Sequence, residues 1–135
     1  MRSHWIVHHG VEILYCDFSN LKRDVDALKA EVNAVDAEIV KKPRGSVRAI
    51  ADLTGTVTST EVVQIFKGSA TATKDFILKQ AVVGVTGMQK ILAQGVAFFS
   101  GQSMHLFDST EKAKDWLAGG AADGGERISA QIGRG

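Results

Sequence analysis

The chain has 135 residues, of which 44% are hydrophobic, and its 16 basic and 15 acidic side chains nearly cancel. A chain of this length forms one globular domain and buries roughly two-thirds of the surface that is exposed in its unfolded state. The balanced charge argues against a binder of nucleic acid or of anionic membranes, because both need a one-sided positive field.

Two extended apolar segments, residues 5–8 and 11–18, open the chain and are separated by His9 and Gly10. This spacing predicts an antiparallel hairpin closed by a tight turn. The second segment is apolar on both faces, which is typical of a strand covered on two sides. We therefore expect the first segment to form an edge of the sheet.

A helical period begins at Asn20, where apolar residues recur at spacings of three and four. Lys41 and Lys42 precede Pro43 at the far end, an arrangement of cations and a breaker that favours a helix terminus there. The stripe that predicts this helix consists of Leu21, Val25, Leu28, Val32, Val35 and Ile39.

Residues 46–117 then alternate between strand and helix patterns, with strands expected at 46–53, 80–85 and 104–107. Each following helix is predicted to start at a capping box, in which two unpaired backbone donors are satisfied reciprocally. The three boxes are Thr58 with Glu61, Thr86 with Gln89, and Asp108 with Glu111. The predicted fold is α/β: an N-terminal hairpin followed by β-α repeats, giving a mixed, mostly parallel sheet of about five strands with helices packed on it.

Residues 1–118 form the expected single domain. The remaining segment, 119–135, contains six glycines in seventeen residues and few large apolar side chains. Burial there is too small to offset the entropy of ordering. We predict a glycine-rich mobile tail.

The parallel strands should present their carboxyl ends at one rim, where open α/β sheets usually bind ligands. That rim is expected to display Asp17, Asp52, Thr86 and Asp108. Asp17 and Asp52 would be the catalytic pair if the protein were an enzyme, but no histidine, glutamate or glycine-rich elbow accompanies them in a recognisable order. We therefore predict no catalytic residues and no cofactor.

The segment from Asp52 to Glu61 is rich in hydroxyl groups, and Ser59 is its natural phospho-acceptor. A phosphate at a helix start is favoured by free N–H groups and by the positive end of the helix dipole. The alternative is that Thr58 serves only as a helix cap and Gly55 only as a turn residue.

Metal ligation by histidine is not expected from the sequence. His4 and His8 would lie about 13 Å apart along a strand at ~3.3 Å per residue, too far to share an ion. His8 and His9 are therefore interpreted as exposed hairpin residues, and His105 has no ligand partner at a suitable spacing. Cys16 lies in an apolar strand and is interpreted as a small buried hydrophobe.

The segment Gly84-Val-Thr-Gly87 lies between a strand and a helix but lacks the spacing of a Walker motif and the third glycine of a dinucleotide fingerprint. Its glycines are interpreted as turn and close-packing residues, with weak anion binding at the helix start as the alternative.

Six motifs follow one another in a specific order: Ile13 to Leu21, Asp52-Leu-Thr-Gly, Glu61-Val-Val, Ala81 to Ile91, Leu106-Phe-Asp-Ser-Thr-Glu, and Asp115-Trp-Leu. Over about residues 11–118 the chain resembles the bacterial STAS-like family, in the branch grouped with anti-sigma-factor antagonists and CRAL-TRIO lipid-binding domains. The resemblance implies a β-α superhelical fold and a non-enzymatic role in regulation, protein binding or small-ligand binding. At the place of the family's phosphorylation motif, Asp-Ser-Ser-Gly, this chain has Thr58-Ser59-Thr60-Glu61, without the aspartate or the glycine of the motif.

Two functions stay open besides the rim enzyme. The first is a regulatory module that binds an unidentified protein partner; a homodimer is compatible with the sequence. The second is a carrier of a small apolar or lipid-like molecule, because the chain holds more apolar bulk near its helix ends than a small core needs. The expected ligand contacts are Phe66, Phe76, Phe98 and Met104.

The expected location is the cytoplasm. A single cysteine, Cys16, excludes an internal disulfide framework, which fits a reducing compartment. The apolar run at the N-terminus is too short for a signal peptide, and no apolar stretch reaches the ~18 residues of a membrane span.

Overall fold

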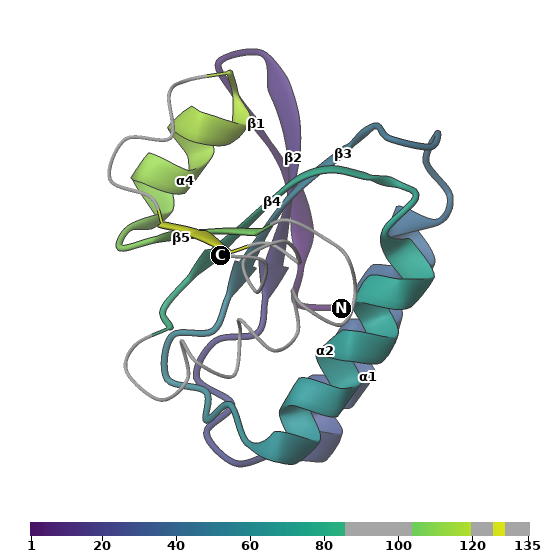
Figure 1. The fold of residues 1–135 in the computed structure, drawn as a ribbon, viewed down its shortest axis with the longest axis vertical. Coiled ribbons are helices and arrows are strands. Elements are labelled where there is room, and N and C mark those ends of the chain that lie inside the picture. Colours follow the sequence, from purple (N-terminus) through teal and green to yellow (C-terminus); the bar gives the residue numbers. More distant parts are fainter. Residues whose placement is uncertain (86–103, 120–125, 129–135) are drawn as a thin grey trace, which may run out of the picture.

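The computed structural model describes residues 1–85, 104–119 and 126–128. Its strands form one six-stranded sheet in the sequential order β1-β2-β3-β4-β5-β6, with helices on both faces (Figure 1). The elements are β1 (His4–His8), β2 (Val11–Asp17), α1 (Val25–Ile39), β3 (Val47–Asp52), α2 (Thr60–Thr73), β4 (Ile77–Val83), β5 (Met104–Phe107), α4 (Thr110–Leu117) and β6 (Glu126–Ile128).

The topology confirms the predicted α/β class. Strands β1 and β2 form an antiparallel hairpin, and β2 to β5 run parallel to one another. Strand β6 adds to β5 in the antiparallel direction, so the sheet has one strand more than the five expected. This strand lies inside the segment predicted as a tail, whose residues 120–125 and 129–135 are outside the described ranges. The segment predicted as a tail thus contains a short strand, Glu126–Ile128, whose backbone pairs with β5.

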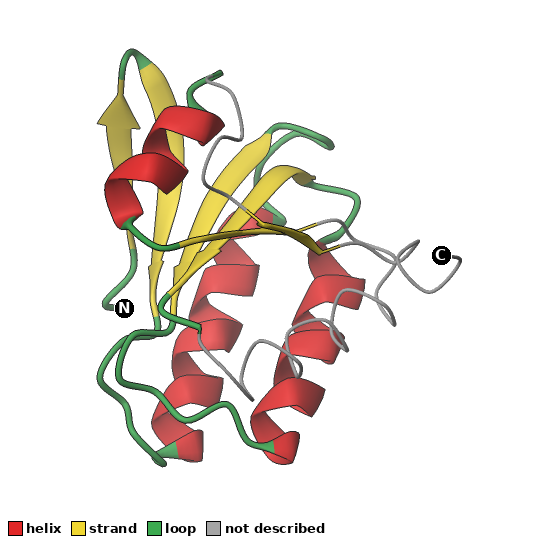
Figure 2. Cartoon of the chain, turned by 60° about the vertical axis from the view of Figure 1, so that its left-hand side comes forward, coloured by secondary structure: helices red, strands yellow, loops and turns green. Residues whose placement is uncertain are grey.

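Helices α1 and α2 cover one face of the sheet, and α4 covers the other (Figure 2). Residues next to each other on a strand point to opposite faces. On β2, Leu14 therefore joins the core under α1 and α2, whereas its neighbour Ile13 joins the core under α4. The sheet is thus buried on both sides, as the apolar pattern of β2 predicts, and β1 forms one edge of the sheet, as expected.

Helix α1 starts at Val25 rather than at Asn20. The N–H of Asn20 donates to the carbonyl of Thr54 (2.7 Å), and the N–H of Lys22 donates to that of Gly55 (3.0 Å). Both donors are consequently committed to the loop after β3, and both residues have positive φ. Asp24 caps the helix instead, because its carboxylate accepts from the N–H of Ala27 (3.0 Å).

The predicted caps of the two later described helices are wrong by one residue. Ser59, not Thr58, caps α2 by accepting from the N–H of Val62 (3.3 Å). Ser109, not Asp108, caps α4 by accepting from the N–H of Lys112 (3.2 Å). Both segments offer two adjacent capping residues, so the local pattern alone does not separate them. The third predicted cap, Thr86, lies outside the described residues.

Two further boundaries differ from the prediction. Helix α1 ends at Ile39, so Lys41 and Lys42 follow the helix rather than closing its last turn. Strand β4 runs over Ile77–Val83 and not over 80–85, because its first residue already pairs with Val47 of β3. It ends before Gly84, whose positive φ (83°) turns the chain.

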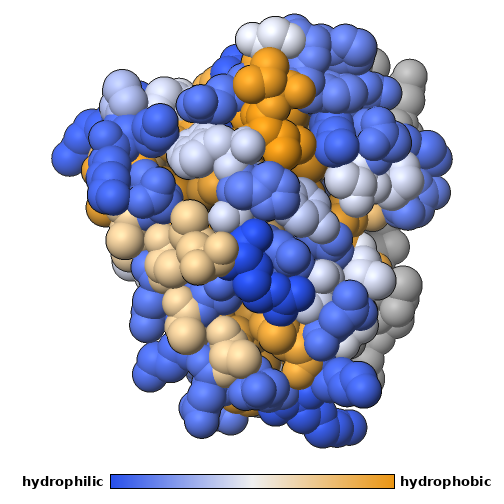
Figure 3. Space-filling view, turned by 180° about the vertical axis from the view of Figure 1, so that it is seen from behind, coloured by the Kyte–Doolittle hydropathy of each residue, from blue (hydrophilic) through white to orange (hydrophobic). Residues whose placement is uncertain are grey.

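The surface of the described residues is mixed in character. The face opposite that of Figure 1 carries hydrophobic side chains in separate groups with hydrophilic side chains between them (Figure 3). The exposed large hydrophobic residues, Met1, Val7, Val40 and Leu78, come from four different segments. None of the helices in the described ranges combines the length and apolar character needed to cross a membrane.

Candidate functional site

The carboxyl ends of the parallel strands meet at one edge of the sheet, as expected. Asp17 is the register partner of Asp52, which in turn pairs with Val83 on β4. Val83 pairs with Phe107, the residue before Asp108. Thr86, the fourth residue predicted for this rim, is outside the described residues.

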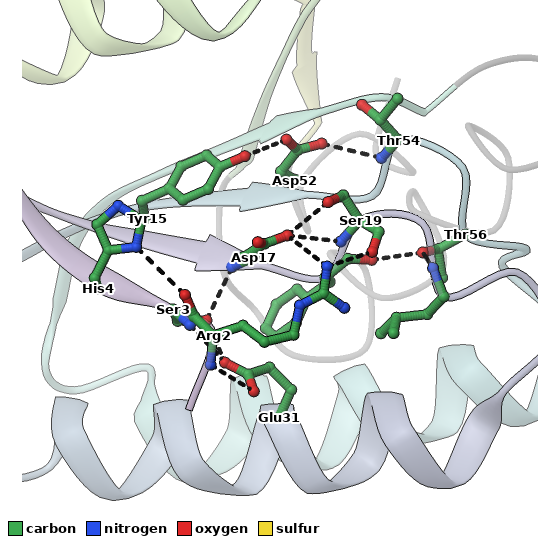
Figure 4. A network of polar contacts seen from close by, with 12 residues as sticks. Arg2, Ser3, His4, Tyr15, Asp17, Ser19, Glu31, Asp52, Thr54 and Thr56 are labelled. Carbon is green, nitrogen blue, oxygen red and sulfur yellow. Dashed lines mark hydrogen bonds and ion pairs between the residues drawn. The ribbon is translucent and has the colours of Figure 1, made fainter.

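Asp17 is held by donors from its own neighbourhood (Figure 4). Its Oδ1 accepts from the N–H of Ser19 (3.1 Å), the hydroxyl of Ser19 (2.6 Å) and the guanidinium of Arg2 (3.2 Å). The same guanidinium nitrogen donates to the carbonyl of Ser19 (2.8 Å). This carboxylate therefore ties the N-terminal segment to the turn after β2.

Asp52 is only 8% exposed and has different partners. One of its oxygens accepts from the N–H of Thr54 (3.0 Å), and the other accepts from the hydroxyl of Tyr15. Burial, followed by this hydrogen bond and the charge of Asp52, raises the pKa of Tyr15 far above its usual value. Asp17 and Asp52 thus bind separate sets of donors, although they were considered as a carboxylate pair.

A third carboxylate, Glu31 on α1, completes this network and was missed from the sequence. It is 7% exposed and accepts from the N–H of Ser3 (2.8 Å), the hydroxyl of Ser3 (2.7 Å) and the N–H of Arg2 (3.1 Å). The Ser3 hydroxyl accepts in turn from the N–H of Asp17 (2.9 Å). The sequence did hold a sign of this burial: Glu31 lies three residues after Leu28 and four before Val35, which places it on the buried stripe of the helix.

The ionised form of Glu31 is the stable one in the fold. Burial opposes its charge, but the hydrogen bonds from Ser3 and Arg2 outweigh that cost, so the pKa of Glu31 is lowered. Most donors to Asp17, Asp52 and Glu31 are backbone N–H groups or nearby hydroxyls. This arrangement fixes chain segments, which is a structural task.

Asp108 stands apart from this network. Its carboxylate forms an exposed ion pair with Lys112, four residues later on α4 (3.1 Å). An exposed pair of this kind adds little stability.

Ser59 and Thr58, the two hydroxyl residues considered for phosphorylation, have different surroundings at the start of α2. Ser59 is partly exposed and serves as the cap. Thr58 is 5% exposed, and its Oγ1 has no hydrogen-bond partner among the described residues. A buried hydroxyl without a partner costs free energy, so Thr58 is an exception that needs a reason.

Thr58 lines a cavity between the sheet and the two helices α1 and α2. The cavity volume is about 80 Å³. Phe66 and Met104, two of the predicted ligand contacts, belong to its lining. Phe76 does not; it packs against the core beneath Arg44, whose guanidinium lies 5.8 Å from the ring. Phe98 lies outside the described residues.

The described cavity wall is mainly apolar with a few polar groups. Asp36 accepts a hydrogen bond from the Ser69 hydroxyl (2.6 Å), and burial raises the pKa of Asp36 despite this bond. Burial also raises the pKa of the Cys16 thiol strongly, with smaller contributions from Asp36 and Glu31. Cys16 is 3% exposed and behaves as the buried hydrophobe that the sequence predicts.

The histidines occupy different surroundings. His4 is exposed beside Tyr15, with ring centroids 5.5 Å apart, and His105 packs against Trp116 at 4.2 Å. His8 and His9, at the hairpin turn, meet Asp115 of α4. The sequence predicts the hairpin but gives no sign of this carboxylate, which is 107 positions away from His8.

Comparison with protein-family models, curated proteins and solved structures finds no match for this chain. The resemblance to the STAS-like family therefore stays a prediction.

Proposed function

We propose that the protein is a non-enzymatic regulatory module of the STAS-like type, which binds a protein partner around the start of α2. The observation that carries this proposal is the position of Ser59. It caps the helix that follows β3, at the rim of the sheet, and its side chain is partly exposed. In the family that the sequence resembles, this is the place of the phospho-acceptor.

The start of α2 would stabilise a phosphate on Ser59. The free N–H groups and dipole at a helix start favour negative charge, and the Ser59 oxygen already faces the N–H of Val62. The neighbouring Thr56 hydroxyl donates to the carbonyl of Phe18 (2.5 Å), which anchors the loop before the helix to the turn that follows β2. Because the loop before α2 is anchored in this way, phosphorylation of Ser59 would change the charge of a surface whose backbone is fixed.

Native mass spectrometry of the protein isolated from its own host tests this proposal. We expect phosphate on Ser59 and a partner protein at a fixed ratio, and Ser59→Asp should alter partner binding at least about tenfold, because phosphate-like charge changes the surface. Ser109→Asp is the matched control, since Ser109 also caps a helix and aspartate keeps the capping function.

The proposal fails if Ser59 carries no phosphate and Ser59→Asp binds the partner like the wild type. A partner that responds equally to Ser59→Asp and Ser109→Asp would also contradict it, because the effect would then be one of general charge.

A second candidate function is the binding of a small apolar molecule, and the cavity with its unpartnered Thr58 hydroxyl favours it. The volume of about 80 Å³ is below the ~150 Å³ of an engineered cavity that binds benzene. The geometry thus favours a short branched molecule with one polar group, and not a lipid chain.

Isobutanol is a suitable probe because it has an apolar body and one hydroxyl group. Saturable binding, followed by methyl chemical shifts, is expected to weaken about fivefold in Thr58→Val, which removes one hydrogen bond of about 1 kcal/mol. Without ligand, Thr58→Val should be as stable as the wild type or slightly more stable. Binding that is absent, or that is unchanged in Thr58→Val, would exclude this site.

A further inference from the structure

The hairpin turn places two imidazole rings side by side. His8 ends β1, and the turn residues His9 and Gly10 both have positive φ, at 51° and 77°. Positive φ at both positions is the geometry of the tight hairpin turn, and histidine adopts it more readily than most residues other than glycine. The ring centroids of His8 and His9 are 4.2 Å apart.

Helix α4 brings a carboxylate to this pair. The Oδ1 atom of Asp115 lies 2.7 Å from Nε2 of His8 and 3.7 Å from Nε2 of His9. The three residues offer ligand atoms that all lie within 4.8 Å of one another. This carboxylate comes from the last described helix and the imidazoles from the first hairpin, so the fold itself assembles the cluster.

The donor set fits a divalent transition metal. Imidazole nitrogen and carboxylate oxygen bind Zn²⁺ at about 2.0–2.2 Å, which places neighbouring ligand atoms of a tetrahedral ion about 3.4 Å apart. The two nitrogen–oxygen distances in the cluster, 2.7 and 3.7 Å, lie on either side of that value. The ligand atoms all lie within 4.8 Å of one another, so side-chain rotations can bring the three of them onto one ion.

The surroundings leave the cluster accessible. The side chains of His9 and Asp115 are 71% and 62% exposed, while His8 is 19% exposed and more firmly placed. The two lysines of α4 are engaged elsewhere: Lys112 pairs with Asp108 (3.1 Å) and Lys114 with Glu111 (3.2 Å). Neither lysine therefore forms an ion pair with Asp115.

We propose that His8, His9 and Asp115 form a binding site for a divalent transition-metal ion, with Zn²⁺ as the expected occupant and water in the remaining coordination position. Binding requires the lone pair of His8 Nε2, so coordination replaces its hydrogen bond to Asp115 and the proton resides on Nδ1 or is released. The ion would join the hairpin to α4, two elements that share the core under α4.

Calorimetric titration of Zn²⁺ into the full chain tests the site. We expect one ion per chain in the wild type and a loss of affinity of more than about tenfold in His8→Gln, His9→Asn and Asp115→Asn, because each replaces an imidazole or carboxylate ligand of Zn²⁺ with a weaker neutral amide. Asparagine is chosen for His9 because it tolerates positive φ, and the variant should therefore keep the turn.

His4→Gln is the matched control. His4 is an exposed histidine on the same strand, but it neighbours Tyr15 instead of Asp115. The control should bind Zn²⁺ like the wild type. The site is refuted if the wild type does not bind Zn²⁺, or if the three ligand variants bind it as tightly as His4→Gln does. Circular dichroism of each variant confirms that a loss of binding is not a loss of fold.

Discussion

The two ends of the parallel strands carry polar clusters of different construction. At the carboxyl end, Asp17, Asp52 and Glu31 accept hydrogen bonds from backbone N–H groups and nearby hydroxyls. At the amino end, where the β1–β2 hairpin turns, His8 and His9 share the exposed carboxylate of Asp115. Backbone donors cannot turn away without unfolding the segment, whereas side-chain ligands can exchange a partner for an ion. The first cluster therefore holds the chain, and the second is suited to binding.

The largest effect is expected at Gly84, which closes the carboxyl end of β4. An added Cβ would overlap the backbone nitrogen of Thr54, and the φ of +83° disfavours any other residue. Gly84→Ala should lower the free energy of unfolding by about 3 kcal/mol, from strain and overlap together. Urea unfolding measures this loss.

Gly45→Ala separates overlap from strain. Gly45 also has a positive φ (68°), but an added Cβ there meets nothing within 4 Å. Its loss should be about 1 kcal/mol. Equal losses in the two variants would show that close packing at Thr54 contributes nothing.

The next largest effect concerns Glu31. Glu31→Gln weakens three hydrogen bonds to a charged acceptor and should cost about 2 kcal/mol at pH 7. Because the fold lowers the pKa of Glu31, its contribution is complete above the unfolded value of about 4.3 and is lost as the pH falls through the folded value. The difference between wild type and variant should therefore shrink in acid.

Unfolding measured from pH 7 down to pH 3 tests this sign. Asp26→Asn serves as the control, because Asp26 is an exposed carboxylate on the same helix. A difference at Glu31 that is constant with pH would contradict the assigned ionisation.

A smaller loss is expected for Tyr15→Phe, about 1 kcal/mol, because Asp52 loses one donor but keeps the N–H of Thr54. Thermal unfolding at neutral pH gives the value. A loss as large as that of Glu31→Gln would mean that the rim depends on this side-chain pair as much as on its backbone donors.

The smallest effect is expected at the amino end. Asp115→Asn should leave the unfolding midpoint unchanged in the presence of a chelator, since exposed pairs add little stability. Added Zn²⁺ should raise the midpoint of the wild type and not that of the variant. A clear loss for the variant in chelator would show that the cluster is structural, like the rim.

Local sequence patterns predicted part of the fold but not the long-range contacts that build the two clusters. The hairpin, the parallel repeats and the burial of Cys16 follow from local spacing, and the structure confirms them. Helix starts were wrong by one residue where Thr58 and Ser59, or Asp108 and Ser109, compete as caps. The start of α1 depends on backbone bonds to the loop after β3, which local periodicity does not reveal.

The contact of Asp115 with His8 depends on where the chain returns after 107 positions. The pairing of Glu31 with Ser3 likewise joins the N-terminus to a helix 28 positions later. No local pattern encodes these two long-range contacts. The position of Glu31 on the buried stripe of α1 does indicate that its carboxylate needs a partner.

Nuclear magnetic resonance of the histidine rings during a Zn²⁺ titration tests the contrast between the two ends most directly. His4 lies beside the rim, and His8 and His9 form the cluster at the turn. We predict that the ring signals of His8 and His9 shift together and saturate at one ion per chain, while those of His4 stay unchanged. Shifts at His4 of equal size, or no saturable shift at His8 and His9, would contradict the division into a structural carboxylate cluster and a metal-binding histidine cluster.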